Sequence, residues 1–77
     1  MVRIEKLEVT EHMARYRYFP EKSKKSGIVA LNRDTGEWSV ENRLGKYSSA
    51  YISHALCRIE EFQRNGRFLE KDVIAWY

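Results

Sequence analysis

The stretch YISHALCRIEEFQRNG, residues 51–66, decides the fold of this chain. Its apolar side chains recur every three or four residues, the spacing that places them on one face of an α-helix. These side chains are Ile52, Ala55, Leu56, Ile59 and Phe62. Gly66 stands where helices often end in a left-handed cap, and Ser48 or Ser49 can cap the start with its hydroxyl oxygen. The pattern predicts a helix from about Ser48 to Asn65.

An amphipathic helix of this length is marginally stable in water by itself, so its apolar face needs a layer to pack on. The preceding half of the chain supplies that layer as strands. In Met13–Phe19 the side chains alternate between two faces. Tyr16 and Tyr18 are expected to face the core under the helix. Arg15 and Arg17 then point to the other side of the sheet.

An earlier strand is indicated by Val2–Val9, which is rich in strand-forming residues. Its alternation changes parity, because Val2 and Ile4 fall on one face while Leu7 and Val9 fall on the other. A β-bulge would reconcile the two halves; alternatively, only one half is buried.

The strand predicted at Met13–Phe19 is followed by a proline, which interrupts the backbone hydrogen bonds between strands. Pro20 has no N–H to donate, so it ends this strand or marks a sheet edge. The residues EKSKKSG, 21–27, form a polar loop. Ile28–Leu31 is apolar throughout, which predicts a strand that is buried on both faces.

A hairpin is predicted at DTG, residues 34–36, between Ile28–Leu31 and the alternating Trp38–Val40. Gly36 tolerates positive φ because it has no Cβ, and Asp34 can hydrogen-bond the backbone of the turn. After the helix, Val73–Tyr77 alternates again and predicts a last strand.

We therefore expect one α+β domain that spans residues 1–77. It consists of a small antiparallel sheet of four strands, or five, packed on one amphipathic helix. The order is β-β-β-β-α-(β). Short connections favour a meander, with the helix laid across one face of the sheet.

The composition is that of a small globular chain. Its 77 residues are 43% hydrophobic and 13% aromatic, which supplies side chains for one core. The single cysteine, Cys57, has no partner for an internal disulfide, which suits a reducing compartment. No apolar run has the length of a signal peptide or a bilayer span. We expect a cytoplasmic protein with no membrane contact, no cofactor and no metal.

The net charge of +3 is concentrated in residues 13–33, where Glu21 is the sole acidic residue. Two interpretations are open. In the first, the arginines of the strand face solvent and the lysines hydrate a loop. In the second, these cations bind phosphates and an aromatic ring on the same strand face stacks a base. The residues of this nucleic-acid site are Arg15, Arg17, Phe19, Lys22, Lys24 and Lys25.

Two large apolar side chains, Trp76 and Tyr77, lie at the C-terminal end of the sequence, where fraying is the usual expectation. They are therefore expected to dock against another surface. Docking onto the parent sheet is the favoured interpretation. The other interpretation makes Trp76 and Tyr77 a protein interface, for example with a second copy across a dimer axis.

A thiol, an imidazole and a carboxylate share the outer helix face, at Cys57, His54 and Glu61. No second ligand cluster accompanies them, and a solvated helix face does not activate a thiol, so neither a metal site nor a catalytic site is expected. We expect a non-enzymatic interaction protein. Its partner is another protein or a second copy of itself, and nucleic acid is the alternative.

Overall fold

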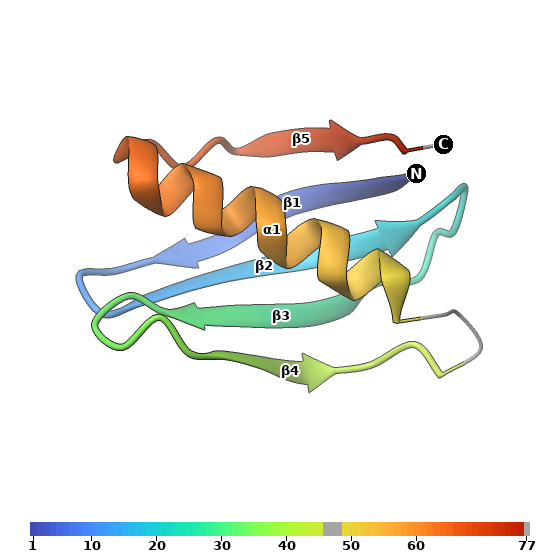
Figure 1. Cartoon of the computed structure of the whole chain (residues 1–77). Helices are drawn as coiled ribbons and strands as arrows, with labels where there is room; N and C mark the ends of the chain where they lie inside the picture. The colour runs from blue at the N-terminus through green and yellow to red at the C-terminus, as the bar shows by residue number, and fades with distance from the viewer. Residues whose placement is uncertain (46–48, 77) are drawn as a thin grey trace.

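The structure, a computed structural model, describes residues 1–45 and 49–76. It contains a five-stranded antiparallel sheet and one helix (Figure 1). The elements are β1 (Val2–Val9), β2 (Met13–Pro20), β3 (Gly27–Asn32), β4 (Trp38–Asn42), α1 (Ala50–Asn65) and β5 (Lys71–Ile74). The predicted α+β class and the element order are confirmed, and the fifth strand is present.

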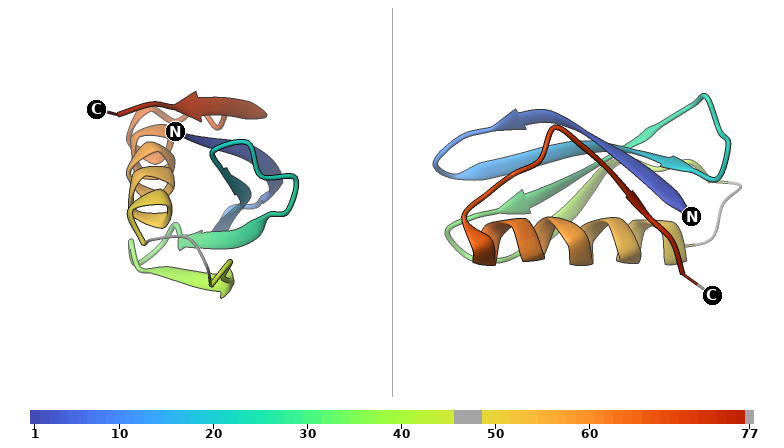
Figure 2. Two further views of the ribbon diagram at one scale, coloured as in Figure 1. Left: turned by 90° about the vertical axis from the view of Figure 1, so that its right-hand side faces the viewer. Right: turned by 90° about the horizontal axis from the view of Figure 1, so that it is seen from above.

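The strands lie in the order β4-β3-β2-β1-β5. The first four strands form a meander, and the chain then crosses the sheet as α1 and returns as β5 along the free edge of β1. Figure 2 shows that the sheet curls around α1, so that the helix lies in its concave face. No helix of the described residues lies on the other face of the sheet, which is convex.

The last strand begins and ends earlier than the alternation of Val73–Tyr77 predicts. It covers Lys71–Ile74, because its ladder is formed with β1 and Ile74 pairs with Val2, the first residue of that strand. Both strands end at this pair, since neither Met1 nor Ala75 is part of the ladder. Tyr77 lies outside the described residues.

The core lies between the concave face of the sheet and the predicted helix stripe. All five stripe residues are buried, with Ile59 at 0% exposure. Tyr16 and Tyr18 are also buried, and each hydroxyl has a partner. The Tyr16 hydroxyl donates to the Leu69 carbonyl at 2.6 Å, and the Tyr18 hydroxyl accepts from the Leu44 N–H at 3.1 Å. These bonds allow two polar groups to lie inside an apolar core.

The change of parity in β1 is resolved by a bulge, as one of the two sequence interpretations requires. The register with β2 shifts between Lys6 and Glu8, which leaves Leu7 without an opposite residue. Val2 and Ile4 are fully buried on the helix side, and Leu7 is 37% exposed. One extra residue therefore returns Val9 to the core side.

The hairpin between β3 and β4 is confirmed, but Asp34 does not stabilise it in the way the sequence predicts. Gly36 has a φ of 80°, as expected. The turn backbone is bonded by Asn32, whose Oδ1 accepts from the N–H groups of Asp34 at 2.9 Å and Thr35 at 3.1 Å. The Asp34 carboxylate instead contacts His12 Nδ1 at 2.7 Å. The carboxylate of Asp34 therefore bonds His12 in the turn between β1 and β2, and not the backbone of its own turn.

The helix ends as predicted but does not begin as predicted. Gly66 adopts the left-handed conformation with a φ of 71°. Ser49 occupies the first cap position, but its backbone is helical and its side chain makes no cap hydrogen bond. The prediction of a Ser49 cap is therefore wrong, because Ser49 contributes only its carbonyl, which accepts from Ser53 N at 3.0 Å. Ser48 lies outside the described residues.

We expect Ile59→Ala to lower the free energy of unfolding by about 2–5 kcal/mol, because it leaves a cavity where the helix meets the sheet. Urea denaturation of wild type and variant would measure this loss. Glu60→Ala, on the exposed neighbouring position, is the matched control and should change stability by less than about 0.5 kcal/mol. Equal losses in the two variants would contradict the assignment of the core.

Candidate binding surfaces

The convex face of the sheet is open because α1 covers only the concave face (Figure 2). The alternation of β2 places Arg15, Arg17 and Phe19 together on this convex face, with Tyr16 and Tyr18 on the other. Three of the residues predicted for a nucleic-acid site therefore share one surface. The structure gives them different surroundings.

Arg15 is occupied by two carboxylates. Its Nη1 lies 2.6 Å from Glu8 Oε1, and its Nε lies 2.9 Å from Glu41 Oε1. The hydrogen bond and charge of Glu41, together with those of Glu8, raise the pKa of Arg15 above its ordinary value. Because the pair with Glu41 joins β2 to β4, it passes over β3, where Ala30 is 1% exposed. Arg15 therefore links three strands of the sheet through its ion pairs, and these carboxylates already neutralise its charge.

This network also bears on the prediction that Ile28–Leu31 is buried on both faces. Val29 and Leu31 are buried under the helix, and Ala30 is buried on the convex side. Ile28 is only half-buried. The prediction holds for three of these four residues, because side chains of the sheet itself cover Ala30.

Phe19 is partly covered by an arginine of the neighbouring strand. Arg3 pairs with Phe19 across β1 and β2, and its guanidinium carbon lies 4.8 Å from the ring centroid. The Arg3 Nη2 also donates to the Ser23 carbonyl at 2.9 Å. Arg3 thus joins the predicted site, although the sequence could not reveal this because the contact depends on the strand register.

A cluster of cations gathers where β2 leads into the loop at 21–26. Arg17, Lys22, Lys24 and Lys25 are exposed, and none forms an ion pair with another described residue. The backbone of Arg43 lies at the same end of the sheet, because the preceding Asn42 pairs with Ile28 at the start of β3. We call this region the basic end. Its residues are Arg3, Arg17, Lys22, Lys24, Lys25 and Arg43.

The loop of the basic end contains one carboxylate, Glu21, and it is already occupied. Its Oε1 accepts hydrogen bonds from the Met1 amine at 3.0 Å and from the Tyr51 hydroxyl at 3.0 Å. These two bonds lower the pKa of Glu21. The backbone of Glu21 has a φ of 49°, which a residue with a Cβ adopts at a cost. The contacts of its carboxylate hold it in this conformation.

Trp76 packs within its own chain. Its ring stacks on His54 of α1 with centroids 3.9 Å apart and planes 13° apart, and it meets Tyr51 edge-on at 5.4 Å. Trp76 therefore docks within its own chain, but on α1 and not on the sheet as the sequence predicts. An interface formed by Trp76 and Tyr77 stays a prediction, and Tyr77 lies outside the described residues.

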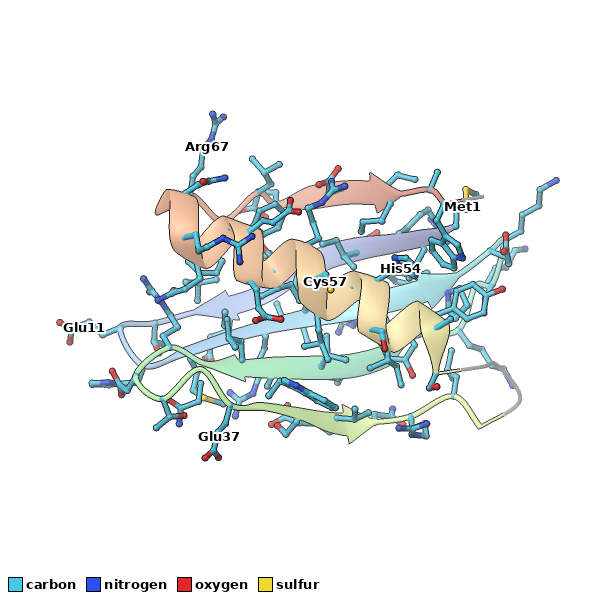
Figure 3. All side chains as sticks on the ribbon, in the orientation of Figure 1. Met1, Glu11, Glu37, His54, Cys57 and Arg67 are labelled. Carbon is cyan, nitrogen blue, oxygen red and sulfur yellow. The ribbon has the colours of Figure 1, made fainter. Side chains whose placement is uncertain are left out.

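The three polar groups on the outer face of α1 have separate surroundings (Figure 3). Cys57 is an exposed free thiol, His54 stacks on Trp76, and Glu61 Oε2 lies 3.4 Å from Arg58 Nε. Within residues 1–45 and 49–76, no group of three or more His, Cys, Asp or Glu side chains is arranged to hold a metal ion.

One exposed residue, Trp38, was not singled out as a site from the sequence. It lies at the start of the edge strand β4, and its register opposite Leu31 turns it toward the helix side. It is 57% exposed, the highest value among the large apolar residues described. A shallow hollow of about 150 Å³ separates it from α1, lined by Trp38, Ser53, Leu56, Cys57 and Glu60. The helical spacing predicts that Leu56 faces the sheet, but only the strand register places Trp38 beside this part of α1.

Comparison of the chain with known protein families, with curated proteins and with solved structures found no match. The one helix in the described part of the chain is too short and too polar to cross a membrane.

We expect Glu21→Gln to destabilise the protein at neutral pH and to have progressively less effect in acid. The pKa of Glu21 is lowered by folding, so its charge stabilises the folded state above the unfolded pKa. That contribution disappears as the pH falls through the folded pKa. Thermal melts of wild type and Glu21→Gln across acid and neutral pH would show the two melting temperatures converging in acid.

Glu11→Gln is the control, since Glu11 is exposed and forms no ion pair within the described chain. Its melting temperature should follow that of wild type at each pH. A difference between wild type and Glu21→Gln that does not change with pH would show that the carboxylate charge is not what stabilises the loop.

Proposed function

We propose that this chain is a non-enzymatic interaction protein and that its partner is a second copy, joined edge to edge along β4. The observation that supports this most is the exposed Trp38 on an edge strand. A large apolar side chain and free backbone groups are the two elements of β-strand addition.

The outer side of β4 presents unpaired backbone groups. Asn32 N–H donates to the Glu37 carbonyl at 2.7 Å, so this pair is bonded across β3 and β4. In an antiparallel ladder, bonded pairs alternate with pairs that exchange no bonds. The N–H and C=O groups of Trp38 and Val40 therefore point away from β3, and among the described strands β4 has no other neighbour.

One antiparallel register uses both outward residues at once. It places Trp38 opposite Val40 of the second copy, with the two-fold axis at Ser39. The indole then packs on a β-branched side chain, a favourable cross-strand pair. This register sets Glu37 opposite Glu41 of the second copy, and the repulsion is reduced because Arg15 Nε holds Glu41 at 2.9 Å.

The two edges of the sheet differ in protection. The edge strand β5 has only four residues, of which Lys71 is exposed, and both features discourage pairing. The edge strand β4 contains neither Lys nor Pro. Its register shift after Val40 ends the regular ladder, so the shared surface is short. A small interface of this kind predicts a weak, reversible dimer.

A non-enzymatic role in the cytoplasm completes the proposal. The side chains with catalytic potential on α1, Cys57, His54 and Glu61, have separate partners or face solvent. An exposed free thiol such as Cys57 is compatible with a reducing compartment.

We expect the mass from sedimentation velocity to rise from monomer toward dimer as the protein concentration increases. In a Trp76→Phe background, Trp38 is the single tryptophan, so its emission should shift to the blue over the same range as Trp38 leaves water. Val40→Pro should abolish both changes, because it removes an outward N–H that β3 does not use.

The matched control is Val73→Ser, which removes an exposed apolar side chain from the opposite edge. It should dimerise like wild type. A monomer mass at every wild-type concentration, or a dimer that persists in Val40→Pro with the fold intact by circular dichroism, would rule out pairing through β4.

A further inference from the structure

We infer that the basic end binds the phosphate backbone of nucleic acid, a role separate from self-association. Its six residues, named above, bring cations from β1, β2, the loop at 21–26 and the end of β4 to one region. The nucleic-acid site predicted from the sequence includes Arg15. In the structure Arg15 forms ion pairs with two carboxylates and is left out of the basic end. The basic end instead includes Arg3 and Arg43.

Five cations of the basic end form no ion pair with another described residue, and the sixth, Arg3, donates to the Ser23 carbonyl. Several cations elsewhere are paired. Lys6 pairs with Glu70 at 3.0 Å, and Arg58 pairs with Asp72 at the sheet edge. At the basic end, the one carboxylate of the loop is taken by the Met1 amine at 3.0 Å. Figure 3 shows Glu11 and Glu37 at the opposite end of the molecule from Met1. Exposed cations also lie at that opposite end, at Arg64 and Arg67, but the basic end gathers more of them.

The arrangement suits an extended polyanion better than a single small anion. Arg3, Arg17 and Arg43 come from β1, β2 and the end of β4. Strands lie about 4.8 Å apart, so these three backbones span roughly 14 Å. A nucleic-acid strand in a duplex advances about 3.4 Å per phosphate, so several phosphates fit within that span. Cations on a flexible loop beside them can follow such a backbone without reading its sequence.

A membrane surface fits the basic end less well. Stable attachment to lipid needs an apolar face to insert beside the charges. The apolar face of α1 is already buried on the sheet, with Ile59 at 0% exposure. At the basic end the aromatic ring is Phe19, half-buried with Arg3 over it at 4.8 Å. An arginine beside an aromatic ring is a surface on which a base can stack.

The test is fluorescence anisotropy with labelled single-stranded and duplex oligonucleotides over a range of salt concentrations. We expect non-specific binding with a Kd of about 10⁻⁴–10⁻⁶ M at physiological salt. If all of the cations of the basic end contact phosphates, log K should fall against log salt with a slope of about −4 on single strands. Binding that is absent at low salt, or that does not respond to salt, overturns the inference.

Lys22→Glu/Lys24→Glu should weaken binding at least about tenfold and reduce the steepness of the salt slope by about 1.4. Arg64→Glu/Arg67→Glu changes the net charge equally at the end of the molecule where Figure 3 labels Arg67. This control should retain most of the affinity. An equal loss in both double variants would mean that overall charge, and not the basic end, binds the ligand.

Two further measurements distinguish nucleic-acid binding at the basic end from membrane binding and from binding that requires the β4 edge. Vesicles that contain anionic lipid should bind more weakly than the oligonucleotides at the same salt, and stronger binding to vesicles overturns the inference. The anisotropy titration of Trp38→Ser should match wild type, because the basic end lies within one copy. A loss of nucleic-acid binding in Trp38→Ser, with the fold intact, would overturn the placement of the site.

Discussion

The burial of the α1 stripe in the concave face of the sheet is the interaction on which the rest of this structure depends. Ile59 and the other stripe residues fill the space that the curled sheet leaves, and neither layer could bury its apolar surface alone. The tyrosines of β2 extend the core to both ends, where their hydroxyls bond the backbone at Leu44 and Leu69. One consequence is that every other side chain of β2 must face outward.

That constraint divides the surface into regions with different chemistry. On the convex face Arg15 is paired with Glu8 and Glu41, so its charge is neutralised within the sheet. The excess of free cations lies at the basic end. The edge strand β4 carries the exposed Trp38 and free backbone groups. We therefore expect that self-association through β4 and nucleic-acid binding at the basic end do not exclude each other.

Local pattern was enough to predict the helix, the alternation of β2 and the hairpin at Gly36, and it left a bulge in β1 as one of two alternatives. Each depends on neighbouring residues in the chain. What the pattern could not provide is the placement of distant segments. The pairing of β5 with β1, the contact of Arg3 with Phe19 and the bond of Asp34 to His12 all depend on strand order and register. Trp38 was missed as a site for the same reason.

Hydrogen exchange of the native protein tests the dependence of both layers on the α1 contact most directly. If helix and sheet stabilise each other, the slowest amides of α1, around Ile59, and of β2, around Tyr16, should open with the same free energy. The loop at 21–26 should exchange much faster. Amides of α1 that exchange well before those of β2, under conditions where β2 stays protected, would contradict this account, because the sheet would then be stable without its helix.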